Sequence, residues 1–273
     1  YKILITNNVS EIDKINFKNY KYFIFVGGDG TIFSFLQKFK NEKFTFGMIP
    51  SGSGNALSYS ILYQKFKKVK INNDLIYLNL FNAISNETSK RIDSMNIIFK
   101  NSKKEITSTL FVSCGIFSNI DLDTEWLRWI GNFRFILGAI YELLKYIICG
   151  NNIYAELEYV DVKGNIKIID GNFAFFMANN MSHTSSTSMT SPFSKPDDGY
   201  IYLAYLLEPT SALNLLYILL GLDSGFFITN LKYIKTKSFR FSPINGKYDI
   251  DGEKFDIEPI EVSIESKKLR VLV

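Results

Sequence analysis

Residues 23–31 read FIFVGGDGT, and residues 49–55 read IPSGSGN. Each stretch is a short apolar run that ends in a glycine-rich turn, and a helical pattern of apolar residues begins directly after each turn. Strand-turn-helix units that follow one another build parallel sheets, in which the turns after the strands meet at one edge. The spacing therefore predicts an α/β domain with two glycine turns side by side at the carboxyl edge of its sheet.

The composition indicates a globular chain long enough for two domains. Of its 273 residues, 47% are hydrophobic and 21% are charged. A net charge of +4 is too small to indicate a nucleic-acid partner, and we expect none. The longest uncharged apolar run, residues 209–222, is too short to cross a bilayer. The chain opens at Tyr1 without a signal-peptide pattern, which predicts a cytoplasmic segment of a longer chain.

Cysteine and histidine usage narrows the chemistry further. The two cysteines, Cys114 and Cys149, cannot form a disulfide framework, which favours a reducing compartment. A single histidine argues against a multi-histidine zinc site. It also argues against a Ser-His-Asp triad, because His183 lies in a Ser/Thr-rich stretch without a nucleophile motif. We expect His183 at the surface or in a loop.

The periodicity changes near residue 88, which predicts an α/β domain over 1–88 and a mainly β domain over 89–273, with a site in the cleft between them. Residues 179–198 predict a mobile loop, and the aromatic-rich region 122–148 predicts helix. In the first part, strands are predicted at 1–5, 22–26 and 46–49 and helices at 10–15, 31–39 and 56–66. In the second part, strands are predicted at 91–99, 107–112, 154–160, 166–169, 173–178, 200–207, 238–241, 248–250 and 262–264.

The first glycine turn has the features of an anion site. Gly27, Gly28 and Gly30 allow unusual backbone angles, and free N–H groups at a helix start attract phosphate. The negative charge of Asp29 is unfavourable next to a bound phosphate unless the side chain handles a proton or a metal. Its presence therefore favours transfer chemistry over passive binding. The alternative is a turn aspartate that caps a helix.

The second glycine turn strengthens the interpretation as a phosphate site. Gly52 and Gly54 again free the backbone, Ser51 and Ser53 add hydroxyl groups, and Asn55 is a candidate N-cap for the next helix. Together the turns predict a nucleoside triphosphate site. The chain lacks both the P-loop and the Rossmann glycine patterns.

Four motifs resemble one known family. GGDGT at 27–31 and PSGSGNAL at 50–57 resemble the catalytic domain shared by diacylglycerol and sphingosine kinases, and the SGNAL form is closer to the sphingosine branch. Residues 114–138, CGIFSNIDLDTEWLRWIGNFRFILG, resemble the sphingoid-recognition segment, and DGE at 251–253 resembles the family's last motif. The chain starts after the family's first strand and its nucleotide loop.

The resemblance implies a lipid kinase that uses ATP and Mg²⁺ and phosphorylates the primary hydroxyl of a sphingoid base. Asp29 takes the position of the general base. Asp121 takes that of the carboxylate that recognises the lipid head. The positions implied for ATP binding are Thr6, Gly27, Gly28, Gly30, Thr31, Ser51, Gly52, Ser53, Gly54, Asn55, Arg128, Arg134, Asp251, Gly252 and Glu253.

The same resemblance makes the second domain the lipid-substrate domain. Its apolar helical region could line a tunnel for the lipid tail, and ordinary helix core is the alternative. A basic cluster of Lys65, Lys67, Lys68 and Lys70 favours either transient contact with an anionic membrane or a solvated surface. The residues assigned to the lipid are Asp121, Phe111, Trp126, Trp129, Ile130, Phe133 and Leu137.

Other functions stay open at this point. Among enzymes, a diacylglycerol or ceramide kinase is the first alternative, and an NAD kinase, which shares GGDG, is a distant one. A nucleotide- or lipid-binding protein without catalysis is the alternative from another class. The missing first strand and Ser34, where the family commonly has Glu, support that alternative.

Overall fold

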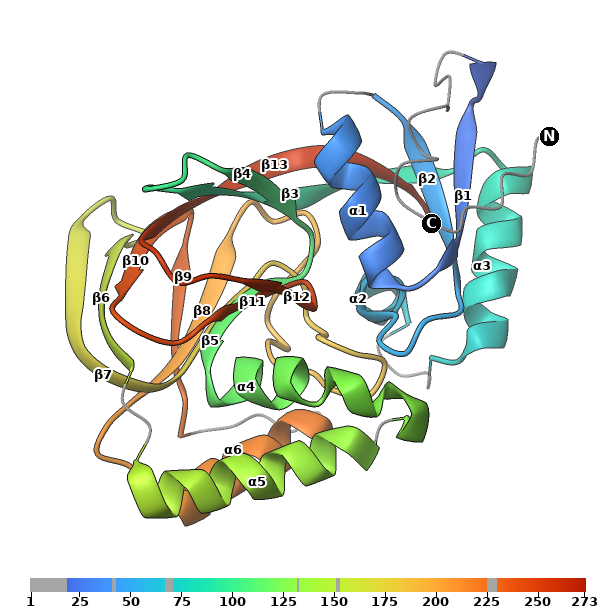
Figure 1. Ribbon diagram of the computed structural model, residues 1–273. Helices are drawn as coiled ribbons and strands as arrows, with labels where there is room; N and C mark the ends of the chain where they lie inside the picture. Colours follow the sequence, from blue (N-terminus) through green and yellow to red (C-terminus); the bar gives the residue numbers. More distant parts are fainter. Residues whose placement is uncertain (1–18, 41–42, 67–70, 132, 151–152, 225–229) are drawn as a thin grey trace.

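The computed structural model describes residues 19–273 except 41–42, 67–70, 132, 151–152 and 225–229 (Figure 1). The strand predicted at 1–5, the helix predicted at 10–15 and Thr6 lie outside the described residues. The helices are α1 (Asp29–Phe39), α2 (Ala56–Lys65), α3 (Asn73–Ser85), α4 (Ile116–Asp123), the 3-10 helix η3 (Glu125–Ile130), α5 (Phe133–Cys149) and α6 (Ala212–Ser224). The strands are β1 (Tyr22–Gly27), β2 (Thr45–Pro50), β3 (Ser89–Phe99), β4 (Glu105–Ser108), β5 (Phe111–Gly115), β6 (Ile153–Val160), β7 (Ile166–Asn179), β8 (Ile201–Leu207), β9 (Lys232–Thr236), β10 (Ser238–Pro243), β11 (Tyr248–Ile250), β12 (Glu253–Phe255) and β13 (Ile260–Leu272).

The N-terminal part has the predicted β-α-β-α order. Strands β1 and β2 pair in parallel from Tyr22↔Thr45 to Gly27↔Pro50, so the two glycine turns leave the same edge of the sheet, as predicted. Helix α1 buries Ile32, Phe35 and Leu36 at a 3.6-residue period. Helix α3 was not predicted, because its apolar residues are spread over several faces.

Strand β13 connects the two parts of the chain. Its residues Arg270 and Val271 pair in parallel with β2. The strand also pairs antiparallel with β10 over residues 260–263 and with β3 over residues 260–265 and 269–272. Within the described residues, all strands belong to one hydrogen-bonded sheet network. The sheet continues across residue 88 and does not mark a boundary there. The division into two domains at that residue stays a prediction.

The second part is rich in antiparallel strands whose inner faces pack aromatic side chains. Phe176 and Phe241 stack with ring centroids 4.0 Å apart, and Phe173 meets Phe241 edge-on at 5.5 Å. All three side chains are buried. Burying aromatic rings of this size is a large favourable term in folding, so this cluster anchors the strands.

Helices α4, η3, α5 and α6 form a layer beside the strands (Figure 1). Helices α5 and α6 lie next to each other, and α4 packs against α5, β5 and β11. This layer contains the helical region predicted at 122–148, but two further segments, 116–121 and α6, also belong to it. Among the described residues, no helix is long and apolar enough to cross a membrane.

One strand predicted for the second part is corrected, and the predicted loop is found but is largely buried. The strand predicted at 107–112 is two strands, because the chain turns at Thr109 and Leu110, whose N–H groups bind Asp251. The segment 179–198 has little regular structure, as expected of a loop, but much of it is buried. His183 is 6% exposed, its N–H donates to Ser60 Oγ at 3.0 Å, and burial lowers its pKa to about 4. It is a packed loop residue and is not at the surface.

Candidate active site

The two glycine turns contact each other through bare backbone. A Cβ atom added to Gly52 would lie 2.5 Å from Gly28 Cα, a distance that side chains do not tolerate. Ser51 N donates to Gly27 O at 3.1 Å and joins the turns across the sheet edge. Glycine is therefore required here by close approach, and the two turns form one unit.

Asp29 joins the first turn to the second helix. It is the first residue of α1, and its carboxylate accepts Ala56 N at 2.8 Å and Leu57 N at 3.1 Å, both from the start of α2. Burial raises the pKa of Asp29 to about 6, although these two N–H groups act to lower it. A carboxyl group with this pKa is ionised at neutral pH and can still accept a proton.

The N-cap role predicted for Asn55 belongs partly to Asp29. Asn55 occupies the N-cap position of α2 with φ of 54°, in the left-handed region that Asn tolerates. Its side chain makes no cap bond. Instead, Nδ2 donates to Gly52 O at 2.7 Å and Oδ1 accepts Gly52 N at 3.0 Å. Asn55 therefore holds the shape of the second turn, and Asp29 caps the helix.

The DGE motif divides into two roles. Gly30 lies beside Glu253, since a Cβ added to Gly30 would be 3.5 Å from Glu253 Oε1. The motif is thus next to the first glycine turn. The Asp251 carboxylate, by contrast, is buried and accepts backbone N–H groups of residues 109–111, at 2.7 to 3.0 Å, and the Ser108 hydroxyl. These donors occupy both of its oxygens, which gives Asp251 a structural role, and its role in ATP binding stays a prediction.

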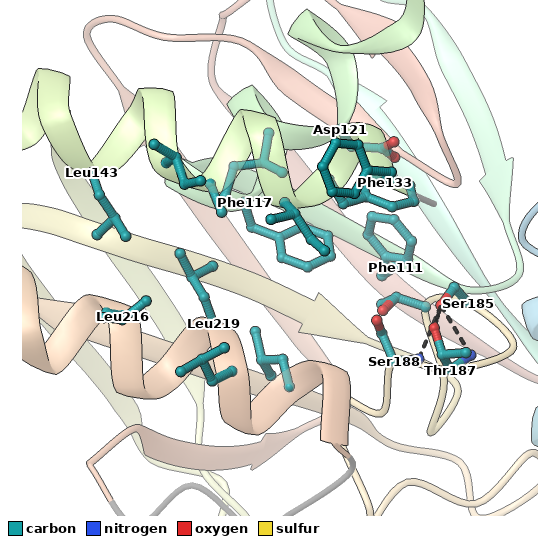
Figure 2. Close-up of a pocket in the computed structure, with 18 residues that line it drawn as sticks. Phe111, Phe117, Asp121, Phe133, Leu143, Ser185, Thr187, Ser188, Leu216 and Leu219 are labelled. Carbon is teal, nitrogen blue, oxygen red and sulfur yellow. Dashed lines mark hydrogen bonds between the residues drawn. The ribbon is translucent and has the colours of Figure 1, made fainter. Parts of the chain in front are cut away.

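A cavity of about 430 Å³ lies between the helical layer and the buried loop (Figure 2). Its volume is within the range of about 300 to 1,000 Å³ usual for small-molecule sites. Asp121, Phe111 and Phe133 lie at the end that faces the loop, and Leu143 and Leu216 lie toward the other end (Figure 2). The lining residues are Phe111, Phe117, Ile120, Asp121, Phe133, Phe135, Ile136, Ala139, Ile140, Leu143, Thr184, Ser185, Thr187, Ser188, Leu216, Leu219, Leu220 and Leu222. Asp121 is the one charged side chain among them.

Asp121 is held by an arginine that was expected to bind phosphate. Arg134 Nη2 lies 2.8 Å from Asp121 Oδ1, and Arg134 Nη1 lies 3.1 Å from Glu125 Oε2. Arg134 is 4% exposed, and its guanidinium also lies over the Phe135 ring. Its charge is thus paired with Asp121, and its assignment to ATP stays a prediction. Arg128 lies in η3, and its side chain is outside the described part of the structure.

Four of the predicted tail contacts do not line this cavity. Trp126 and Trp129 are 75% and 81% exposed, and Leu137 is 39% exposed. Ile130 lies in η3 beside them. Their predicted contact with the lipid tail stays a prediction, since the structure shows only that they lie away from this cavity.

The cavity and the glycine turns are linked by backbone contacts. Ser186 N donates to Gly54 O at 2.6 Å, while its neighbours Ser185 and Thr187 line the cavity. On the other side, Asp251 N donates to Phe111 O at 3.2 Å. The polar end of the cavity therefore adjoins the second glycine turn and the DGE motif.

The chain offers no protein-only metal site in its described part. No group of three or more His, Cys, Asp or Glu side chains converges there. Mg²⁺ characteristically keeps several waters and binds through nucleotide phosphates with few protein ligands. The glycine turns supply backbone N–H groups of the kind that nucleotide phosphates accept.

Residues 6–97 match the diacylglycerol kinase catalytic domain. The chain is 24% identical to sphingoid long chain base kinase 4 of Schizosaccharomyces pombe, over 91% of this chain and 61% of that protein. It is also 24% identical to human sphingosine kinase 1, over 78% of this chain and 64% of that protein. The chain is thus similar to sphingosine and sphingoid base kinases. It spans less than two thirds of the length of these relatives.

Solved structures extend the likeness to the fold. A putative diacylglycerol kinase from Bacillus anthracis superposes with a TM-score of 0.70 at 17% identity, covering 98% of this chain and 85% of that one. At this identity the match shows the fold alone. The likeness nevertheless includes both the α/β part and the strands that follow it.

Several cavity residues were missed by the sequence analysis. Helix α5 contributes Ile136, Ala139, Ile140 and Leu143, which repeat at helical spacing, and α6 contributes a similar set. The α5 periodicity was available as a signal. No such signal was available for residues 184–188, because polar loop residues carry no pattern that points to a partner.

Proposed function

We propose that this protein is a lipid kinase that transfers the γ-phosphate of ATP to the primary hydroxyl of sphingosine or a related sphingoid base. The observation that carries the proposal is Asp121. One carboxylate, with loop hydroxyl groups at the same end of a cavity that is apolar along the rest of its length, matches an amphiphile with a cationic head and a hydrocarbon tail (Figure 2). Each buried methylene of the tail contributes about 0.8 kcal/mol.

The residues divide the reaction between them. Asp29 accepts the proton of the substrate hydroxyl. The hydroxyl oxygen of the substrate forms a bond to the γ-phosphorus, and the bond between that phosphorus and the leaving oxygen of ADP breaks. The backbone N–H groups of the two glycine turns bind the phosphates. When bound, Mg²⁺ supplies charge neutralisation. Catalysis of this kind depends mainly on positioning and electrostatic stabilisation.

The head-group carboxylate favours an amine over a neutral lipid. A hydrogen bond to a charged group contributes about 1.5 to 3 kcal/mol, which an ammonium group can form with Asp121. Diacylglycerol and ceramide lack that charge and offer nothing to offset the desolvation of the carboxylate. They remain the alternative substrates, and a binding protein without catalysis is the alternative from another class.

The test is a lipid panel with labelled ATP on the full-length protein. Sphingosine and dihydrosphingosine should be phosphorylated, and ceramide and diacylglycerol should not. Asp121→Asn should raise KM for sphingosine and leave KM for ATP near its wild-type value. Phosphorylation of the neutral lipids alone would overturn the substrate assignment, and no phosphorylation of any lipid would favour the binding protein.

We also propose that the protein contacts a membrane surface transiently while it takes up its substrate. Beside the cavity, apolar side chains on the helical layer are open to solvent, among them Trp129 at 81%, Ile148 at 79% and Leu213 at 79%. Interfacial helices use such side chains to enter the headgroup region. Trp129→Glu should reduce sedimentation with phosphatidylcholine vesicles, and unchanged sedimentation would contradict the proposal.

A further inference from the structure

Behind Asp121 lies a second carboxyl group that the proposed reaction does not use. Asp249, on β11, is fully buried, and its Oδ1 accepts Gly252 N at 2.9 Å. Its Oδ2 is buried and finds no donor among the described residues. Asp121 is its neighbour across the contact between α4 and β11, so two carboxyl groups face each other.

Ser113 gives independent evidence that the polar groups here are incompletely satisfied. It lies directly opposite Asp249 in the antiparallel pairing of β5 and β11, which places the two side chains on one face of the sheet. Its hydroxyl is also buried without a partner. Two such atoms side by side are unusual, because buried polar groups in proteins are almost always paired.

The protonation of the pair follows from the groups around it. Asp121 is the charged member, because Arg134 pairs with it directly at 2.8 Å. Burial, followed by the charge of Asp121, raises the pKa of Asp249 well above its ordinary value. Asp249 therefore carries a proton and can donate it to Asp121, which satisfies Oδ2.

The other ionisable neighbours do not change this assignment. Asp251, at the end of β11, adds negative charge that further disfavours ionisation of Asp249. Lys254 pairs with Asp249 in the register of β12, but its side chain is exposed. Cys114 on β5 is buried, and burial raises the pKa of its thiol to about 12, so it is neutral. Glu125 on η3 is 46% exposed, and solvent screens its charge.

Of the charged groups at the head site, Arg134 is buried, Asp121 is largely buried, and the two pair with each other. Asp251 is also buried, but its carboxylate is bound by the backbone N–H groups of residues 109–111. An ammonium group that binds at Asp121 adds a second buried cation, and an unpaired buried charge is strongly unfavourable. We propose that Asp249 is a specificity-determining residue that releases its proton when a cationic head binds and so supplies a further buried anion. This inference rests on the proposed function, since it assumes that an amine enters the cavity.

The proton step is balanced. The O–H bond of Asp249 breaks, its electron pair stays on the carboxylate, and the proton leaves to the buffer. A neutral lipid brings no charge and triggers no release, so Asp249 stays protonated beside Asp121. Asp249 acts through Asp121 and is a positioning residue, since it does not line the cavity itself.

The test counts protons released on binding. A short-chain, water-soluble sphingoid base is titrated calorimetrically into the full-length protein at pH 7 in two buffers that differ in ionisation enthalpy. We expect wild type and the matched control Asp123→Asn, which removes a solvent-facing carboxylate from the same helix, to release about one proton per amine bound. Asp249→Asn should release almost none. It should also lower the preference for the amine over its N-acetyl analogue by about tenfold or more.

The outcomes separate this inference from the proposed function. Amine binding without proton release in wild type, or with equal release in Asp249→Asn, would overturn the inference while the kinase assignment stands. Absence of amine binding would overturn both. The wild-type proton count needs no variant, so the test holds even if Asp249→Asn does not fold, which thermal unfolding would reveal.

Discussion

Asp251 should be a major determinant of stability rather than a ligand of ATP. Its carboxylate accepts the N–H groups of Thr109, Leu110 and Phe111, all of which are at most 3% exposed. In Asp251→Ala these three donors lose their acceptor in a place that water does not reach. Each buried donor left without a partner costs about 1 to 3 kcal/mol, so the free energy of unfolding should fall by at least about 3 kcal/mol.

The backbone conformation of Asp251 makes a second contribution to the stability change, which can be measured separately from that of the lost hydrogen bonds. Asp251 has φ of 54°, in the left-handed region, where a Cβ atom costs about 1 to 2 kcal/mol and glycine costs nothing. Asp251→Gly should therefore be less destabilising than Asp251→Ala. Asp251→Asn keeps one acceptor oxygen and places its NH₂ group near a donor, so its loss should be about 1 to 3 kcal/mol.

The assay is urea unfolding, with stability compared at constant m-value. Asp161→Ala is the matched control, because Asp161 Oδ1 also accepts two backbone N–H groups, at 2.8 and 2.9 Å, but in an exposed turn where water can replace it. Its cost should stay below about 1 kcal/mol. A cost for Asp251→Ala as small as that of the control would refute the structural role and return Asp251 to the list of ATP ligands.

Four further predictions concern activity and binding. Because burial raises the pKa of Asp29 to about 6 and the reaction needs the ionised form, kcat at saturating substrates should fall about tenfold per pH unit below pH 6 and level off above pH 7. Asp29→Asn should lose about 10²- to 10⁴-fold in kcat with ATP affinity largely kept, and turnover near wild type would remove Asp29 from the role of base. Gly52→Ala should weaken ATP binding measured by calorimetry, since the new Cβ would lie 2.5 Å from Gly28 Cα; unchanged affinity would mean that the two turns are not one unit. Ala139→Phe should fill the cavity and raise KM for the lipid but not for ATP, and an unchanged lipid KM would place the tail elsewhere.

The sequence alone determined the elements near the glycine turns and the pairing of the turns. The apolar runs before Gly27 and Pro50 are local signals, and a β-α-β order leaves few ways to arrange them, so the parallel pairing of β1 with β2 was predictable. Asp29 could be singled out because a carboxylate in a phosphate turn is unfavourable without a function. Asp121 was singled out only by the resemblance of its segment to a family motif. These inferences depend on neighbours that are close in the chain.

Tertiary structure alone decided which partner each polar group meets. Arg134 pairs with Asp121, Asp251 binds the 109–111 turn, and His183 is buried against Ser60, and in each pair the partners come from different elements. The exposed side of Trp126 and Trp129 was decided in the same way, by the packing of η3 on α4 and α5. The energy of a buried charge depends on all the groups within a few ångströms, and residues far apart in the chain supply most of those groups.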